Sequence, residues 1–145
     1  MPFKEGFTLG PFSVDADGRL SPIHPDSVPG FTVRWRGRVT HARLSATEGD
    51  GGILALQADL GRIPSTFPDP ARRAACFSAL RGVMRDIPAT WTGGMRPDHQ
   101  PRLEVKTEIT LPVTAADLVT ELTAFLLELA PWLDLMDAAG IQAGA

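Results

Sequence analysis

The chain has 145 residues, of which 43% are hydrophobic and 21% are charged, and its net charge is −3. This balance predicts one globular domain over residues 1–145 and excludes a wholly disordered chain. The negative net charge also argues against electrostatically driven binding to nucleic acid or to anionic lipid.

The first third of the chain predicts short strands. Phe7 to Ile23 has the pattern of a hairpin that turns at Asp17-Gly18, and a proline-bearing loop follows. Phe31 to Val39 alternates apolar and polar residues, which is the period of a half-buried strand. Because the apolar residues change from odd to even numbers after Thr40, we expect a bulge or bend between Gly37 and His41.

Two later segments also alternate as strands do. Ile53 to Leu60 places its leucines on one face, and Arg102 to Leu111 alternates along its whole length. Between them, Pro88 to Pro101 contains prolines, a Gly93-Gly94 pair and Trp91, and this composition predicts a polar loop.

Two segments predict helices. Asp69 can cap a helix that starts at Pro70 and runs to about Arg85 with one apolar face. Thr114 can cap a second helix that Gly140 ends, and Pro131 predicts a kink or break in it near Leu129-Ala130. The resulting order of strands, helix, strand and helix predicts an α+β fold, an antiparallel sheet with two main helices packed on one face.

The ends and the apolar segments predict a cytoplasmic protein of bacterial type. The first residues contain no apolar run that could act as a signal peptide. The most apolar segment, Leu118 to Met136, is interrupted by polar residues, which indicates a core helix rather than a membrane span. The single cysteine, Cys76, cannot form an internal disulfide.

The residues that bind metals or act as nucleophiles are scattered. His24, His41 and His99 lie in three different segments, and no paired metal-binding motif is present. Cys76 falls on the apolar face of the first predicted helix, where a thiol behaves as a small hydrophobic group. We therefore expect no metal, no cofactor and no assignable catalytic residue.

Arg34, Arg36 and Arg38 are predicted to form a basic stripe on one strand face. This stripe could dock an acidic segment or nucleic acid. Alternatively it is a solvated face whose arginines pair across the sheet with carboxylates, for which Glu104, Glu108 and Asp59 are the candidates. The overall acidity of the chain favours the solvated face.

Large aromatic residues mark a candidate partner surface. We select Trp35, Trp91 and Trp132, since tryptophan is enriched at interfaces, although the sequence favours a core position for Trp132 over a partner contact. The last helix also predicts self-association, because some of its apolar residues lie off the main face: Val119, Leu127 and Leu135.

The sequence from Leu54 to Pro64, LALQADLGRIP, resembles the strand and turn of the CesT-like type III secretion chaperones. A helix (Arg72 to Met84), a strand with a proline turn (Ile109 to Val113) and a closing helix follow as they do in that family. In the closing helix, Phe125, Trp132 and Met136 have a similar spacing. The YbjN-type fold has the same element order and is equally compatible.

This resemblance implies a small acidic cytoplasmic homodimer without catalysis or cofactor. Such chaperones hold an extended segment of a partner protein on apolar patches, and this is the function that we expect. The alternative is a small-molecule-binding protein or small enzyme that uses the region of Arg34, Arg36, Arg38 and His41, together with Asp59 or Glu104.

Overall fold

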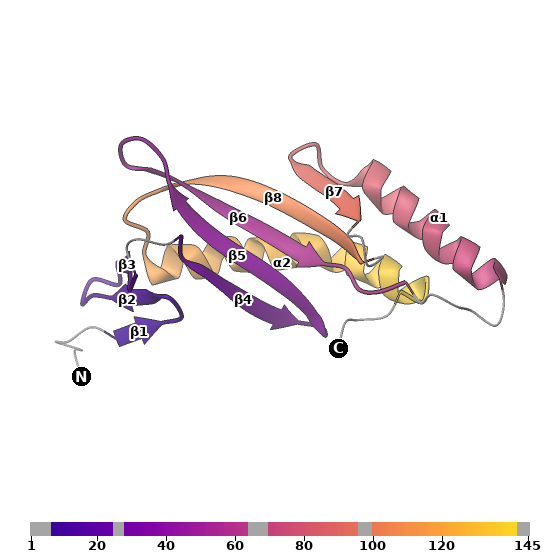
Figure 1. The fold of residues 1–145 in the computed structure, drawn as a ribbon, viewed down its shortest axis with the longest axis horizontal. Coiled ribbons are helices and arrows are strands. Elements are labelled where there is room, and N and C mark those ends of the chain that lie inside the picture. The colour runs from indigo at the N-terminus through magenta and orange to yellow at the C-terminus, as the bar shows by residue number, and fades with distance from the viewer. Residues whose placement is uncertain (1–6, 25–27, 64–69, 96–99, 142–145) are drawn as a thin grey trace.

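The computed structural model describes residues 7–24, 28–63, 70–95 and 100–141. Over these residues the chain forms two antiparallel sheets and two helices (Figure 1), which confirms the predicted α+β class. The predicted helix cap Asp69 lies outside the described residues. In chain order the elements are β1 (Phe7–Leu9), β2 (Phe12–Val14), β3 (Leu20–Pro22), β4 (Gly30–Trp35), β5 (Arg38–Ala46), β6 (Gly51–Asp59), α1 (Pro70–Asp86), β7 (Trp91–Met95), β8 (Pro101–Thr110) and α2 (Ala115–Ala138).

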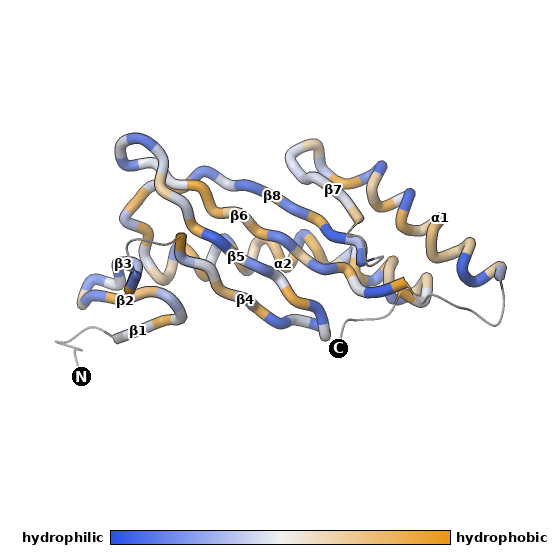
Figure 2. The backbone as a smooth tube through the Cα atoms, viewed as in Figure 1, coloured by the Kyte–Doolittle hydropathy of each residue, from blue (hydrophilic) through white to orange (hydrophobic). Residues whose placement is uncertain are grey.

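The large sheet has the strand order β4-β5-β6-β8-β7, and all of its strand pairs are antiparallel. Figure 2 shows hydrophilic and hydrophobic positions alternating along these strands. Because successive side chains of a strand point to opposite faces, one face of the sheet is apolar and the other is polar. The buried apolar residues of β5, β6 and β8 include Ala42, Leu44, Leu54, Leu56 and Leu103.

The small sheet has the order β1-β2-β3 and continues the predicted hairpin by one strand. Its β2–β3 turn is closed by Asp15, whose side chain accepts hydrogen bonds from the backbone amides of Asp17 and Arg19. Phe12 and Val14 point into the core, and the ring of Phe12 contacts the edge of Phe31 in β4 at 6.1 Å between ring centres. The small sheet therefore packs against one end of the large sheet.

Helix α2 lies behind the large sheet in Figure 1 and covers its apolar face. Thr114 caps the helix as predicted, because its side chain accepts a hydrogen bond from the Asp117 amide. The sequence predicted a kink or a break at Pro131, and the helix does not break there, since it continues to Ala138. Buried Leu129 and Leu133 hold the turns on either side of Pro131. The carbonyl that loses its donor belongs to exposed Leu127 and can be hydrated.

The predicted strand from Phe31 to Val39 is two strands. Arg36 and Gly37 have φ angles of 54° and 72° and form a tight two-residue turn between β4 and β5. Trp35 and Arg38 lie directly opposite each other, so odd residues of β4 share a face with even residues of β5. This reversal of the chain, rather than a bulge, explains the change in the alternation.

The predicted loop from Pro88 to Pro101 contains a strand. β7 pairs with β8 at the edge of the large sheet, and Trp91 lies opposite Val105. Helix α1 packs beside β7, and the side chain of Met84 lies directly over Gly93. The glycine pair thus provides close packing between the helix and the strand instead of a loop.

Gly93→Val is therefore expected to lower the free energy of unfolding by about 1–3 kcal/mol. A Cβ atom at Gly93 would overlap the Met84 sulfur, whereas a Cβ atom at Gly94 would meet no atom within 4 Å. Urea denaturation of Gly93→Val and of the matched control Gly94→Val measures the difference. Equal stability of the two variants would contradict the close packing of α1 on β7.

Candidate functional site

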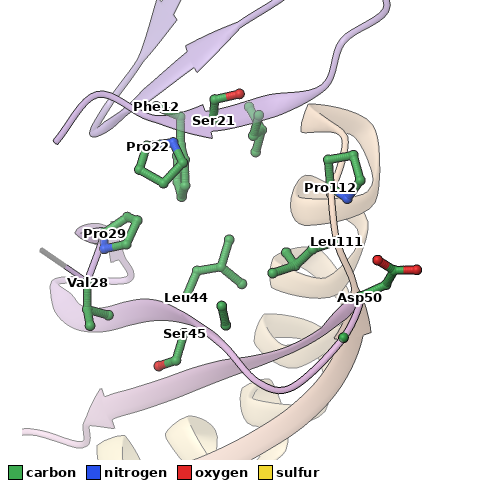
Figure 3. A pocket seen from close by; sticks show the side chains of 13 residues that line it. Phe12, Ser21, Pro22, Val28, Pro29, Leu44, Ser45, Asp50, Leu111 and Pro112 are labelled. Atoms are coloured by element: carbon green, nitrogen blue, oxygen red, sulfur yellow. The ribbon is translucent and has the colours of Figure 1, made fainter. Parts of the chain in front are cut away.

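An open groove lies between the small sheet and one end of the large sheet (Figure 3). Its volume is about 550 Å³. β3 and the segment before β4 form one wall, the C-terminal end of β5 and the turn after it form the floor, and the turn after β8 closes the far end. The lining residues are Phe12, Leu20, Ser21, Pro22, Val28, Pro29, Leu44, Ser45, Ala46, Gly49, Asp50, Leu111 and Pro112.

Backbone hydrogen bonds hold the walls of the groove in place. The Leu20 amide donates to the Val113 carbonyl, and the Ala115 amide donates to the Gly18 carbonyl, which ties the small sheet to the start of α2. The Leu44 amide donates to the Pro29 carbonyl, which ties the segment before β4 to β5 on the floor of the groove. The groove is therefore formed by ordered strands and their turns.

The groove is chemically apolar. Among the described lining residues, Asp50 is the one charged residue, and none is a histidine that could act beside the hydroxyl groups of Ser21 and Ser45. One of the lining side chains, Val28, is 45% exposed. Such a surface suits burial of apolar groups and offers no nucleophile with an adjacent base.

The three arginines of the predicted stripe do not share one face. Arg34 lies on the exposed polar face of β4, Arg36 lies in the tight turn, and Arg38 points from β5 into the core side, where it is 4% exposed. The chain reverses its direction at Arg36, so arginines that are spaced by two residues no longer lie side by side on one face of a strand. The predicted continuous stripe is wrong.

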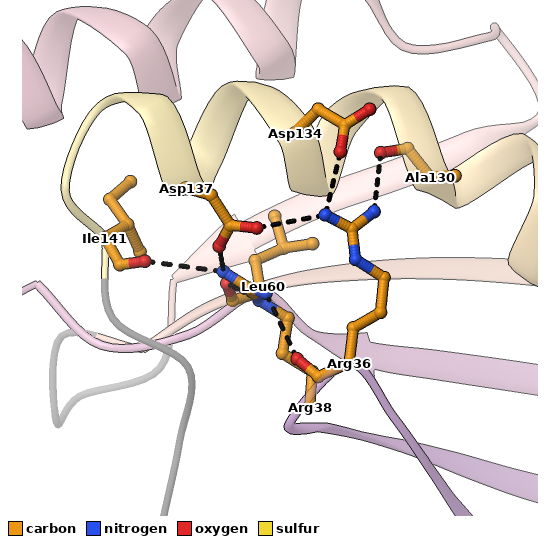
Figure 4. Close-up of polar contacts among 7 residues, drawn as sticks. All are labelled: Arg36, Arg38, Leu60, Ala130, Asp134, Asp137 and Ile141. Atoms are coloured by element: carbon orange, nitrogen blue, oxygen red, sulfur yellow. Dashed lines mark hydrogen bonds and ion pairs between the residues drawn. The ribbon is translucent and has the colours of Figure 1, made fainter.

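Arg36 and Arg38 bind the C-terminal end of α2, as Figure 4 shows. Asp137 accepts from both arginines, at 3.0 Å from Arg36 Nη2 and 2.6 Å from Arg38 Nη2. Asp134 accepts from Arg36 Nη2 at 2.7 Å, and the Ala130 carbonyl accepts from Arg36 Nη1 at 3.3 Å. We call these two arginines and two aspartates the arginine clamp.

Arg38 also satisfies backbone groups in the interior. Its Nε donates to the Leu60 carbonyl at 2.7 Å, and its Nη2 lies 3.4 Å from the Ile141 carbonyl. The hydrogen bond to Asp134 raises the pKa of Arg36 above its ordinary value, and the charges of Asp134 and Asp137 act in the same direction. Arg36 is therefore charged at every ordinary pH. The clamp partners lie on the last helix, not on the sheet carboxylates that the sequence suggested.

The three tryptophans have different environments. Trp91 is 7% exposed and packs against Phe125 of α2, with 5.1 Å between ring centres. Trp35 and Trp132 are half-buried against the core, and the Arg36 guanidinium lies 5.6 Å from the centre of the Trp35 ring. Trp35 and Trp132 are thus the more accessible of the three.

A polar cluster lies on the face of the sheet that turns away from α2. Asp59 accepts from Arg102 Nε at 2.9 Å and lies 3.3 Å from His41 Nε2. Gln57 joins Arg102 to Glu104 through its side-chain amide. The alternative prediction, a small-molecule site or small enzyme, grouped His41 with Asp59, and these two side chains do lie next to each other. Arg36 and Arg38 are turned toward α2 and are not part of this cluster.

The described residues contain no group of three or more histidine, cysteine, aspartate or glutamate side chains that could hold a metal ion. His99 lies outside these residues. Cys76 is buried on α1, and its thiol lies 2.9 Å from the Ala139 carbonyl, so it joins the end of α2 to α1.

Sequence reasoning did not find the groove. It predicted a proline-bearing loop after the hairpin, and the lining residues come from separate segments of the chain that meet only in the fold. The one local signal was the group of prolines in and beside that loop. Proline lacks the amide hydrogen that strand pairing uses, so these prolines indicate a place where the strand pairing stops and a groove can form.

Within the described residues, no helix is long and apolar enough to cross a membrane. No family model, no curated protein and no solved structure matches the chain. The resemblance to the secretion chaperones therefore stays a prediction.

Proposed function

We propose that this chain is a non-enzymatic, chaperone-like protein-binding domain that holds an extended segment of a partner protein on its apolar surface. The observation that carries the proposal is the apolar groove between the two sheets. We place this activity in the cytoplasm and expect the domain to act as a homodimer without a cofactor.

The size and chemistry of the groove support a peptide segment as the occupant. A volume of about 550 Å³ accommodates a few large apolar side chains. The extended strand β3 and the segment from Val28 to Pro29 lie along one wall, so an extended chain can run parallel to them. Exposed Val28 would become covered in the complex, which provides a gain from apolar burial.

The alternative of a small enzyme or small-molecule site has less support. It needs Arg34, Arg36, Arg38 and His41 in one place, and none of these four residues lines the groove. Arg36 and Arg38 are already bound to Asp137. The cluster of His41, Asp59 and Arg102 lies on a sheet face rather than in the groove, and its arginine and carboxylate neutralise each other.

Site-specific photo-cross-linking in the native cells tests the proposal. The photoreactive residue p-benzoylphenylalanine is placed at Val28, which is exposed and lines the groove, and in a second protein at Ala74, which is exposed on α1. We expect position 28 to give one discrete polypeptide adduct that maps to a short apolar segment, and position 74 to give none. Identical adducts at both positions, or a small-molecule adduct at position 28, would contradict the proposal.

A further inference from the structure

β4 ends the large sheet, and no strand of the described residues pairs with its outer edge. In Figure 1 no labelled helix or strand lies along the outer edge of the second half of β4. Gly30, Thr32 and Arg34 are exposed, and Phe31, Val33 and Trp35 are partly exposed. β4 contains no lysine and no proline, which are common means of blocking an edge strand. The edge is therefore able to pair with another strand.

The register with β5 identifies the backbone groups on this edge. The Leu44 amide donates to the Pro29 carbonyl, so the hydrogen-bonded pairs with β5 are those of the odd β4 residues. The backbone N–H and C=O groups of Gly30, Thr32 and Arg34 consequently point away from β5. Among the described residues these groups have no backbone hydrogen-bond partner outside the strand pairing. They form a regular row of donors and acceptors.

The side chains of β4 are arranged almost symmetrically about Val33. Thr32 and Arg34 flank it on the polar face, and the aromatic residues Phe31 and Trp35 flank it on the apolar face. A two-fold axis brings identical surfaces together, so an interface on this axis needs such self-complementarity. We propose that two copies of this chain pair antiparallel through β4, centred on Val33, and join their five-stranded sheets into one continuous sheet.

This register gives each of the central β4 residues a suitable partner in the other copy. Phe31 of one copy faces Trp35 of the other, twice over, and such aromatic cross-strand pairs are favourable. Arg34 of one copy faces Thr32 of the other, so the two Arg34 side chains do not oppose each other. A register centred on Thr32 would instead place each Trp35 opposite Pro29 and lose the aromatic pairs. The charge arrangement and the aromatic pairs therefore both favour a second copy as the occupant.

The last helix is a weaker candidate for the interface. Val119, Leu127 and Leu135 are exposed as the sequence suggested. They follow one another at intervals of eight residues, and each interval rotates the side chain by about 80° at about 100° per residue. The three side chains thus spread around the helix instead of forming one stripe. The proposal concerns self-association alone and stands or falls independently of what binds the groove.

Disulfide trapping tests the register. In the proposed pairing, the two Val33 residues form a non-hydrogen-bonded pair with Cα atoms about 4.5 Å apart, which suits a disulfide. We expect Val33→Cys to form a covalent dimer in a buffer with oxidised glutathione, and wild type to form none because Cys76 is buried. Thr32→Cys is the matched control and should cross-link at least about tenfold more slowly, since its Cα atoms lie farther apart. Faster cross-linking of Thr32→Cys, or none at Val33→Cys, would overturn the proposal.

A proline variant tests the edge without relying on cysteine chemistry. The Thr32 amide points to the outer edge, so Thr32→Pro leaves the β4–β5 hydrogen bonds intact and blocks the new pairing. Light scattering over a concentration series should give a dimer for wild type and for Thr32→Val, and a folded monomer for Thr32→Pro. A wild type that stays monomeric, or a Thr32→Pro variant that stays dimeric and folded by circular dichroism, would overturn it.

Discussion

Trp91→Ala is expected to lower the free energy of unfolding by about 3–5 kcal/mol, the range found when large buried aromatic residues are truncated. Trp91 is 7% exposed and faces the apolar side of β7. Its ring packs at 31° to the ring of Phe125, so the variant leaves a cavity between the edge strand and α2. Strands β7 and β8 cannot close this cavity without changing their pairing.

Urea denaturation of Trp91→Ala and of the control Met95→Ala measures this effect. Met95 lies on the same strand but is exposed, so its truncation should change the stability by less than about 0.5 kcal/mol. A Trp91→Ala variant that is as stable as Met95→Ala would contradict the core position of Trp91.

Arg38→Ala is expected to lower the free energy of unfolding by about 2–4 kcal/mol, since buried acceptors that lose their donor are costly. The Leu60 carbonyl loses its Arg38 Nε donor, and the Ile141 carbonyl loses its contact with Nη2. Asp137 is half-exposed and keeps its ion pair with Arg36. The lost contact between Arg38 and Asp137 therefore contributes less to the decrease in the free energy of unfolding.

Arg34→Ala is the matched control for the arginine clamp. Arg34 is exposed and makes no ion pair with the described residues, so its truncation should change the stability by less than about 0.5 kcal/mol. Equal losses for the two variants would mean that Arg38 does not hold α2 against the sheet. A larger loss for Arg34→Ala than for Arg38→Ala would contradict the exposed, unpaired position of Arg34.

The sequence predicted most of the core. β6 and β8 alternate without interruption, and each position expected to face inward in β6 is buried. Both helices begin close to the predicted residues, because Pro70 and Thr114 are local signals that tertiary contacts do not override. Where the hydrophobic pattern is long and regular, the local sequence is sufficient to predict the element and its buried face.

The predictions from sequence were wrong where one local pattern is compatible with two different structures. A change of alternation after Thr40 fits both a bulge and a reversed strand, and Arg-Gly is a less familiar turn pair than Asn-Gly. Gly93-Gly94 fits both a loop and a strand beneath a helix, and only the contact with Met84 decides between them. Pro131 is tolerated because α2 is held by packing and by the arginine clamp on both sides of it.

The candidate site was the least predictable part. The arginine clamp joins residues about one hundred positions apart, and nothing in the local pattern at Arg36 or Arg38 points to Asp134 or Asp137. The groove likewise brings together the small sheet, β5 and the turn after β8. Such sites depend on which strand edges meet, and this requires the complete topology.

The measurement that tests the central claim most directly is the affinity of the cross-linked segment, synthesised as a peptide, for three proteins. These are wild type, Val28→Asp in the groove and Ala74→Asp on α1, both at exposed positions. The account predicts that Val28→Asp weakens binding at least about tenfold, or about 1.4 kcal/mol, while Ala74→Asp leaves it unchanged. Equal affinity of all three proteins, or no binding by wild type, would contradict a role of the groove in holding a partner.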